Sequence, residues 1–287
     1  MLHSPTTDSL HHQLPRSITM KLNPWFSVRD WLLSQLQYRE LRGVPIDSPE
    51  ITIRRRELVQ RNACARFSFE RWYRELASLV IDAPAGLRVE LGSGGGFLDQ
   101  FIPSLITTDV VELPFVDKVC VAEDLPFSDA SVGALVMVNV LHHVGDVECF
   151  FREAERVLMP GGVIAMVEPY VSTFSRFVYR YLHHEPFDPE TKDWSLPPAG
   201  RLSGGNDALP WIVFVRDRLR FERQHPKLRI ENIRPHSAFS HLLSGGVTTR
   251  PLAPLRMIRA LAGLEARHPG AMKRLGLFFT VKIRRCT

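Results

Sequence analysis

Apolar residues along this chain follow two different spacings, and the spacing changes at the segment 83–86. Before that segment, apolar residues recur every three or four positions over 52–80, which predicts helix with a break near Phe67. After it, short apolar runs typical of strands alternate with more polar stretches. The runs are 87–92, 105–110, 117–122, 133–140 and 162–169. Apolar strands separated by crossovers predict a mostly parallel sheet that is covered on both faces.

Further elements are predicted around these strands. Residues 146–159 form an amphipathic helical pattern between the last two strands, with Asp146 as the N-cap. Two later apolar runs, 227–234 and 276–285, are expected to pair as an antiparallel edge of the sheet.

The predicted elements suggest three parts of the chain. Residues 1–20 are polar and are expected to be disordered. A helical cap is expected over 21–82, beginning with a helix over 28–41 and continuing with the longer helical stretch. The strands place the main domain at 83–287.

The segment 89–97 carries the strongest chemical signal, because a strand there runs into a glycine-rich turn. Glycines at 92, 94 and 96 permit positive φ and let a ligand approach the backbone closely. The dinucleotide fingerprint requires a glycine where Phe97 stands. The acidic Glu90 just before the turn is unsuited to a pyrophosphate and suits a ligand with an ammonium group.

This turn and four later motifs resemble those of the class I S-adenosylmethionine-dependent methyltransferases, in particular the type 11-like domain of bacterial methyltransferase-domain proteins. The likeness covers roughly residues 86–170. The motifs follow one another in the family's order: ELGSGGG at 90–96, Asp109 after the second strand, VAEDLPF at 121–127, NVLHHV at 139–144 and RVLMPGGVIAMVEP at 156–169.

The resemblance implies an α/β fold with a Rossmann-like, seven-stranded, mostly parallel sheet, and S-adenosylmethionine as the cofactor. It implies that Glu90 contacts the methionine amino group and that Asp109 accepts both ribose hydroxyls. The expected cofactor-binding residues are Glu90, Gly92, Ser93, Gly94, Gly96, Asp109, Ala122, Glu123, Asn139 and His142. From the residues alone, Glu90 as a helix cap, Asp109 as a turn residue and a structural role for the histidine at 142 stay open.

The chain departs from the family pattern in three places. Val121 stands where the family usually has an acid, so the adenine amino contact is expected to fall to Glu123 or to backbone. Gly133 stands where the fourth strand usually begins with aspartate. The segment 109–122 is too short for the usual crossover helix, so the N-terminal helices are expected to cover that face of the sheet.

Groups suited to a methyl acceptor follow the fifth strand. Ligands of open α/β sheets bind beyond the carboxyl ends of the strands, and an acceptor-side segment is therefore expected over 171–225. A hydroxyl acceptor benefits from a general base, most often histidine or a carboxylate. The candidate catalytic residues are His183, His184, Glu185 and Asp188, with Asn206 and Trp211 nearby. A plain turn fixed by two prolines explains the same residues equally well.

Two further segments offer weaker signals. An insertion is expected over 234–272, between the sixth and seventh strands. Within it, residues 244–250 suit either an anion-binding loop with Arg250 or an ordinary glycine turn. The eleven histidines show neither H-x₃-H nor cysteine–histidine spacing, so no metal site is expected.

Composition and charge limit the classes of protein that fit. The 287 residues are 45% hydrophobic and 23% charged, as in globular domains, and no apolar run reaches membrane-spanning length. Four cysteines without CxxC pairing indicate a reducing, cytoplasmic setting. The net charge is +5, but residues 81–214 carry 8 basic and 19 acidic groups, whereas 215–287 carry 16 and 4. That basic region either pairs with the acidic middle or contacts an anionic partner such as a membrane surface.

The expected function is therefore methyl transfer from S-adenosylmethionine to a small-molecule or glycan-type acceptor, at oxygen. One alternative is a catalytically silent cofactor-binding or assembly protein, with the acceptor pocket blocked by Trp194 or Trp211. A nucleic-acid methyltransferase that uses the basic C-terminal region ranks third, because no basic stripe interleaved with aromatic residues is visible.

Overall fold

A computed structural model describes residues 34–286, apart from residues 184, 198, 199 and 201. By its contacts the chain divides into two units, Met1–Leu36 and Gln37–Thr287. The sheet, the helices around it and the cavity described below all belong to the second unit.

Two predictions concern the N-terminal region. The expected disorder over 1–20 and most of the expected helix over 28–41 lie outside the described residues. Within the described part of that helix, residues 34–36 are helical, and Arg39–Leu41 forms the short 3-10 helix η1. The expected cap boundary at residue 82 does not separate two units, because the helices α2 (Pro49–Arg61) and α3 (Ala63–Leu79) belong to the unit that contains the sheet.

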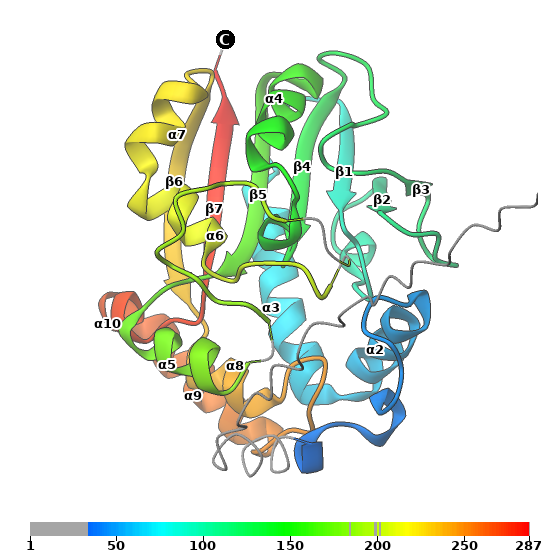
Figure 1. Cartoon of the computed structure of the whole chain (residues 1–287), viewed down its shortest axis with the longest axis vertical. Coiled ribbons are helices and arrows are strands. Elements are labelled where there is room, and N and C mark those ends of the chain that lie inside the picture. Colours follow the sequence, from blue (N-terminus) through cyan, green and yellow to red (C-terminus); the bar gives the residue numbers. More distant parts are fainter. Residues whose placement is uncertain (1–33, 184, 198–199, 201, 287) are drawn as a thin grey trace, which may run out of the picture. The chain divides into compact units, whose positions relative to one another are not determined.

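The seven strands form one sheet in the order β3-β2-β1-β4-β5-β7-β6 (Figure 1). Strands β1 to β5 are parallel, and β7 runs antiparallel between β5 and β6. This is the predicted Rossmann-like sheet, and the predicted pairing of the last two strands is confirmed, although only β6 lies at the edge. The strands are β1 (Leu87–Leu91), β2 (Leu105–Asp109), β3 (Lys118–Val119), β4 (Val132–Val138), β5 (Leu158–Pro169), β6 (Leu228–His236) and β7 (Phe278–Arg285).

Alternate residues of the central strands pack into two separate cores, because successive side chains of a strand point to opposite faces. On one face, Leu135 and Met137 of β4 are buried with apolar residues of four helical segments. These segments are α4 (Val147–Val157), α6 (Leu209–Trp211), the π-helical turn η4 (Ile212–Arg216) and α7 (Arg218–Gln224). Asp146 caps α4 as predicted, accepting a hydrogen bond from the Cys149 backbone N–H at 2.9 Å.

The opposite face is covered by the N-terminal helix α3 (Ala63–Leu79), as the short second crossover predicts. Its Trp72, Tyr73 and Leu76 are buried in one cluster with Ala134 and Val136 of β4. Between β2 and β4 the described chain contains only the two-residue strand β3, so the longer strand predicted over 117–122 is wrong.

The helical stretch breaks earlier than the apolar spacing predicts. The structure ends α2 (Pro49–Arg61) before Asn62 and begins α3 after it, so the break predicted near Phe67 is wrong. Asn62 has extended backbone, and its side-chain oxygen accepts a hydrogen bond from the Cys64 N–H at 2.9 Å. A capping side chain therefore sets the break, whereas Phe67 continues the apolar face of α3.

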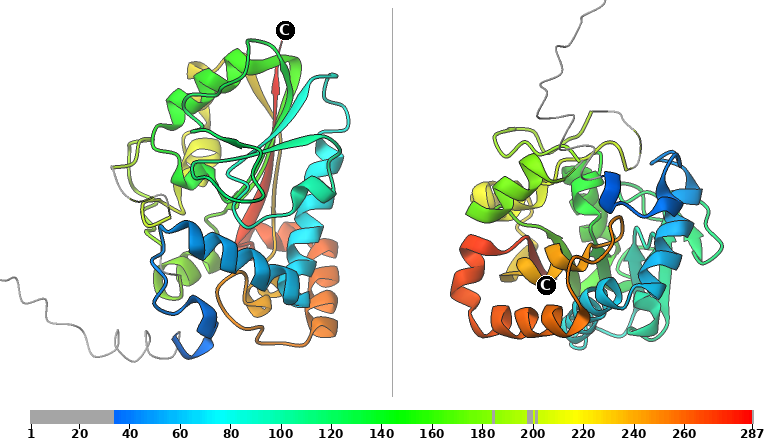
Figure 2. Two further views of the ribbon diagram at one scale, coloured as in Figure 1. Left: turned by 90° about the vertical axis from the view of Figure 1, so that its right-hand side faces the viewer. Right: turned by 90° about the horizontal axis from the view of Figure 1, so that it is seen from below.

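Several helices gather beyond the end at which the parallel strands finish (Figure 1). They come from three separate parts of the sequence, and the view from below shows them around that end (Figure 2). They are α2, α5 (Thr173–Tyr181), α8 (Phe239–Ser244), α9 (Leu255–Arg267) and α10 (Pro269–Leu275). The last three lie between β6 and β7, where the insertion is predicted. Among the described residues, every helix is too short or too polar to cross a membrane.

Candidate functional site

A cavity of about 610 Å³ lies at the carboxyl ends of β1, β2 and β4. Its volume falls within the roughly 300–1,000 Å³ that ligand pockets occupy. The glycine turn after β1 lines one part, and α5 with the loop after it lines another. The turn after α8, residues 245–249, lines the cavity as well, whereas Arg250 does not. The insertion therefore contributes a glycine turn to the wall.

Glu90 is the buried acid at the end of β1, and its side chain lines the cavity. The Ser93 hydroxyl donates a hydrogen bond to Glu90 Oε2 at 2.8 Å. Burial raises the pKa of Glu90 to about 7, because the charged form loses its hydration, and the Ser93 hydrogen bond opposes this only in part. A carboxylate in this position gains most from a cationic ligand that replaces the lost solvation.

The turn after Glu90 needs glycine for two different reasons. Gly92 and Gly94 have φ of +61° and +50°, a region that favours glycine. A Cβ on Gly96 would lie 2.8 Å from both the Ser93 carbonyl oxygen and the Tyr73 hydroxyl, so no larger residue fits. The backbone of this turn can therefore approach a ligand without side chains between them.

Asp109 ends β2 and holds the glycine turn against that strand. Its Oδ2 accepts a hydrogen bond from the Gly94 N–H at 2.9 Å, and its Oδ1 accepts one from the Val111 N–H at 3.2 Å. A carboxylate can accept about four hydrogen bonds, so two sites remain for donors in the cavity. The side chain is buried but lines the cavity, as a residue that binds two hydroxyls would.

Ala122, Glu123 and Asn139 line the walls beside this turn. The Glu123 carboxylate accepts a hydrogen bond from the Asp146 N–H at 3.1 Å, which fixes it near the start of α4. Asn139 follows β4 with φ of +58°, and its Oδ1 is buried without a hydrogen-bond partner. A buried acceptor without a partner is costly, which marks Asn139 Oδ1 as an atom that a bound ligand would satisfy.

The second half of the cavity is built on His142, which lies in the turn η3 (Leu141–His143) after β4. Glu168 at the end of β5 is fully buried, and its Oε2 lies 2.8 Å from His142 Nδ1. Its Oε1 accepts hydrogen bonds from the Val140 and Leu141 N–H groups, each at 2.8 Å. One carboxylate therefore orients both the turn and the ring.

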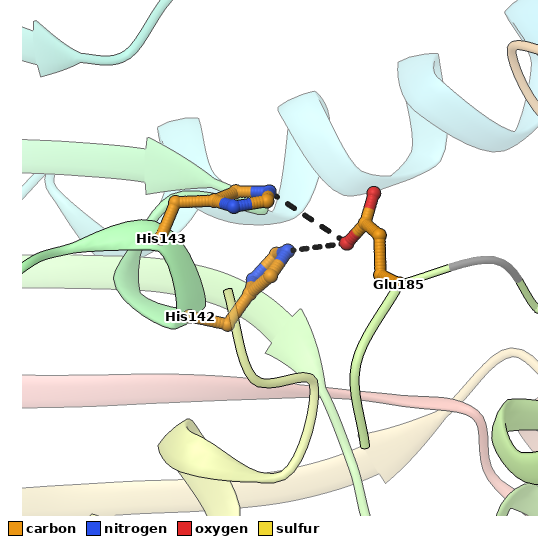
Figure 3. A group of neighbouring side chains, drawn as sticks. All are labelled: His142, His143 and Glu185. Atoms are coloured by element: carbon orange, nitrogen blue, oxygen red, sulfur yellow. Dashed lines mark ion pairs between the residues drawn. The ribbon is translucent and has the colours of Figure 1, made fainter. Parts of the chain in front are cut away.

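Three separate segments meet at this histidine. The Asn206 N–H donates to the His142 carbonyl at 2.9 Å, and the Asp207 N–H donates to the Pro186 carbonyl at 3.0 Å. These backbone hydrogen bonds bring Glu185 and Asp207 to the rings of His142 and His143. Figure 3 shows both rings directed at the Glu185 carboxylate, with Nε2–Oε2 separations of 3.4 Å from His142 and 3.7 Å from His143.

His183 completes this half of the cavity. Its Nδ1 lies 2.9 Å from Asp207 Oδ2, and Asp207 is almost fully buried. Burial lowers the pKa of His183, but the neighbouring Asp207 carboxylate raises it more, so the net shift is upward. For His142, Glu168 and Glu185 likewise outweigh burial and raise the pKa well above 6.5, whereas burial dominates at His143 and lowers its pKa.

The structure brings most of the predicted site residues to this one cavity. All ten predicted cofactor-binding residues line it, and so do His183 and Glu185. His184 lies outside the described residues. Asp188 does not line the cavity: it is exposed, and its Oδ1 accepts a hydrogen bond from the Glu190 N–H within its own turn. The structure therefore does not bring Asp188 together with His183 and Glu185 in this cavity.

Asn206 and Trp211, which are predicted to lie near the catalytic group, do not line the cavity. The Asn206 amide bridges the Asp188 backbone, accepting from its N–H and donating to its carbonyl, each at 2.9 Å. Glu168 lies against His142 and Asp207 lies against His183, and neither acid is among the residues predicted for the site. Glu168 is the last acid of an apolar strand, a signal that could have identified it, whereas Asp207 follows no recognisable spacing.

The comparison with known families gives one match within the chain. The family model of a methyltransferase domain matches residues 89–166, from β1 through β5, which includes the glycine turn, Asp109 and η3. The same segment forms the parallel part of the sheet, in the order β3-β2-β1-β4-β5. The chain contains a class I S-adenosylmethionine-dependent methyltransferase domain.

The methyltransferase domain is also similar to individual proteins. Demethylmenaquinone methyltransferases of two Tropheryma whipplei strains, Twist and TW08/27, are 39% identical over 64 residues. This match covers 21% of the chain and only 27% of those relatives. An S-adenosylmethionine-dependent methyltransferase from Mesorhizobium loti is 16% identical, with a TM-score of 0.41, and the match covers 74% of this chain and 96% of that one. A geranyl diphosphate methyltransferase structure with sinefungin is 15% identical, with a TM-score of 0.41, and the match covers 76% and 78%.

S-adenosylmethionine is the cofactor of this methyltransferase domain, and the groups present fit it. The cofactor has an ammonium group, two ribose hydroxyls and a polar adenine edge. The cavity offers the buried Glu90 carboxylate, the remaining acceptor sites of Asp109 and the unpartnered Asn139 Oδ1. Each of these atoms lacks part of its solvation or hydrogen bonding in the protein, and each faces the same cavity.

Proposed function

We propose that the chain transfers a methyl group from S-adenosylmethionine to an oxygen of a small-molecule or glycan-type acceptor. One observation carries the proposal: a single cavity joins the Glu90–Asp109 side to the side formed by His183, Glu185 and Asp207. A donor and an acceptor bound in these two halves lie in one space, where they can be aligned for displacement.

On the cofactor side we assign one task to each residue. Glu90 binds the ammonium group, directly or through water, and Asp109 accepts the ribose hydroxyls. Ala122 and Glu123 border the adenine, and Asn139 with His142 borders the methionine portion. When bound, the cofactor supplies an electrophilic methyl group. The chain's own contribution is to hold that group in line with the acceptor and to exclude water.

On the acceptor side we assign proton removal to His183. Its Nδ1 lies 2.9 Å from Asp207 Oδ2, and this buried carboxylate stabilises the positive charge that the ring gains when Nε2 takes up a proton. A hydroxyl of the acceptor that gives its proton to Nε2 becomes the nucleophile for the methyl group. Glu185 contributes negative charge beside the histidines, and Asp188 has no part in this step.

The acceptor is expected to carry an apolar portion. Val178, Leu182, Leu242 and Val247 line the cavity together with the polar group. Because the matched relatives are named as demethylmenaquinone methyltransferases, a demethylated quinol belongs among the acceptors to be tested, and label on its ring carbon instead of on oxygen would contradict the proposed oxygen transfer. Its apolar body would meet these side chains.

A transfer assay tests the proposal. Purified full-length protein is incubated with methyl-labelled S-adenosylmethionine and, in parallel, a demethylated quinol or a small-molecule cell extract. Label is expected in an oxygen-methylated small molecule with the wild type. In His183→Gln the rate should fall about 10²–10⁴-fold, the usual contribution of acid–base catalysis. The affinity of His183→Gln for the cofactor, measured by calorimetry, should stay within about threefold of the wild-type value. This is less than the tenfold change that about 1.4 kcal/mol of binding free energy would produce.

The two alternatives predict different outcomes of this assay. Cofactor binding with no labelled product from any acceptor would favour the silent cofactor-binding protein. Its expected signature, a pocket blocked by Trp194 or Trp211, is absent from the described cavity lining. Label in RNA or DNA, with binding that falls steeply with salt, would favour the nucleic-acid methyltransferase. Equal rates in His183→Gln and wild type would remove His183 from the mechanism.

A further inference from the structure

Glu185 faces His142 and His143 at distances that do not suit ordinary hydrogen bonds. Its Oε2 lies 3.4 Å from His142 Nε2 and 3.7 Å from His143 Nε2 (Figure 3). A hydrogen bond between an imidazole and a carboxylate is normally about 2.7–2.9 Å long. In the same site, His142 Nδ1 and Glu168 reach 2.8 Å, so the wider spacing at Glu185 is specific to the Nε2 side.

The wider spacing fits a metal ion between the three atoms. Zinc binds imidazole nitrogen and carboxylate oxygen at about 2.0–2.2 Å, so two ligand atoms of a tetrahedral site lie about 3.3–3.6 Å apart. One ligand atom each of His142, His143 and Glu185 lie within 4.8 Å of one another, and the Nε2 atoms are the ring nitrogens that face Glu185 Oε2. Small side-chain rotations would therefore bring all three to bonding distance of one ion.

Both histidines also have the outer partners that metal-binding histidines require. His142 Nδ1 faces the Glu168 carboxylate at 2.8 Å, and His143 Nδ1 faces the Gly204 carbonyl at 2.9 Å. These acceptors hold a ring proton on each Nδ1, so Nε2 is the atom through which each ring would bind a metal ion, with the ion replacing any proton there. A carboxylate or backbone carbonyl behind each ring is the arrangement found at metal-ligating histidines.

The loop behind His143 packs directly against the ring. A Cβ on Gly205 would lie 2.7 Å from His143 Nδ1, so only glycine allows the Gly204 carbonyl to reach the ring. The site is also largely shielded, since the side chains of His142, His143 and Glu185 are 4%, 12% and 13% exposed. All three nevertheless line the cavity, which leaves a coordination position open to a ligand.

From this arrangement we propose that His142, His143 and Glu185 bind one divalent transition-metal ion, with zinc as the ion that the ligand set fits. Two histidines and one carboxylate with an open position is a ligand set of catalytic zinc. Asp207 Oδ1 lies 3.9 Å from His142 Nε2, so this carboxylate would lie close to the bound ion. The sequence predicts no metal site, because the histidines lack the spacings typical of zinc ligands. The ligands proposed here are instead two adjacent histidines of one turn and a carboxylate 42 positions later.

The role of the ion rests on the proposed function. The ion would hold the acceptor through its oxygen, in the half of the cavity next to the bound methyl donor. A bound hydroxyl oxygen loses its proton more readily, because the ion stabilises the negative oxygen. The proton would pass to His183, the oxygen would form the new bond to carbon, and the methyl–sulfur bond would break with its electron pair remaining on sulfur.

Metal binding can be tested without any knowledge of the acceptor. Tag-free full-length protein is stripped with a chelator and titrated with Zn²⁺ by calorimetry and with Co²⁺ by absorption spectroscopy. We expect one ion per chain and a tetrahedral Co²⁺ spectrum. His143→Ala and Glu185→Gln should each lower Zn²⁺ affinity by at least about 100-fold. Loss of a residue that only supports a metal ligand already lowers affinity by about 10–100-fold, and loss of a ligand itself should cost at least as much. The matched control His268→Ala removes an exposed histidine at the end of α9 and should bind like the wild type.

The results separate this proposal from the proposed function. Absence of saturable Zn²⁺ and Co²⁺ binding, or equal affinity in Glu185→Gln and wild type, would overturn the metal site. If the variants fail to fold, the wild-type Co²⁺ spectrum decides, since an octahedral spectrum contradicts a three-ligand tetrahedral site. S-adenosylmethionine binding is measured separately on the stripped protein. Methyl transfer by stripped protein that binds no metal would refute this inference alone, whereas metal binding without methyl transfer would refute only the proposed function.

Discussion

At the scale of single residues, Glu90 shows how burial sets the chemistry of the site. The side chain is 3% exposed, and burial raises its pKa to about 7. An unfolded chain has a glutamate pKa near 4.3. Between about pH 4.3 and pH 7 the folded protein holds the Glu90 proton more tightly than the unfolded chain does. The free energy of unfolding therefore falls as the pH rises through this range. The full penalty, up to about 4 kcal/mol, is present above pH 7.

The variant Glu90→Gln tests this balance. In the cofactor-free protein at pH 8, the variant should have a higher free energy of unfolding than the wild type, because the buried charge is gone. Its affinity for S-adenosylmethionine should fall about 10–100-fold, since a hydrogen bond to a charged group contributes about 1.5–3 kcal/mol. Chemical denaturation at pH 5 and pH 8, with calorimetry at pH 8, measures both effects. A stability difference that does not change with pH would contradict the raised pKa.

At the scale of elements, α3 replaces the crossover helix that the short β2–β4 connection cannot supply. Its Leu76 is fully buried in a cluster with the apolar residues of β4 and β5 that face this side of the sheet. The helix also reaches the site, because the Tyr73 hydroxyl accepts a hydrogen bond from the Phe97 N–H at 3.3 Å, directly after the glycine turn. An N-terminal helix is therefore part of the core that supports the cofactor side.

Truncation of Leu76 measures how much this helix contributes. Leu76→Ala should lower the free energy of unfolding by about 2–5 kcal/mol, the range for buried leucines in which a cavity remains. The matched control Leu264→Ala removes the same atoms from a side chain of α9 that is 53% exposed, and should change stability by less than about 0.5 kcal/mol. Urea denaturation of both variants provides the comparison. Similar losses in the two variants would mean that α3 does not cover the sheet.

At the scale of the whole molecule, the cavity is a product of chain topology. Its walls come from the turn after β1, the end of β2, the turn after β4, the loop after α5 and the turn after α8. The basic C-terminal region is partly neutralised within the fold, where Arg284 pairs with Glu231 and Asp82. Contact of the remaining basic groups with an anionic partner stays a prediction.

Because cofactor binding engages several of these segments, it should stabilise the whole unit. At a cofactor concentration 100 times its Kd, the expected gain is about 2.7 kcal/mol. For a domain of this size, this corresponds to a rise in Tm of roughly 5–10 °C. Asp109→Ala should abolish most of this rise, and NADH should produce none in the wild type. A thermal melt measures the shifts, and an equal rise in Asp109→Ala would remove Asp109 from the cofactor site.

The sequence by itself determined the alternation of strands and helices, the glycine turn after Glu90 and the position of Asp109, because these features are local in the chain. Backbone conformation and the end of a strand follow from a few neighbouring residues. Tertiary structure decided which distant side chains meet. His142, Glu185 and Asp207 are brought together by the Asn206 N–H···His142 carbonyl and Asp207 N–H···Pro186 carbonyl hydrogen bonds, while Asp188, close to Glu185 in sequence, turns away. Sequence spacing cannot reveal such contacts, because they depend on how loops that follow different strands pack against one another at the same end of the sheet.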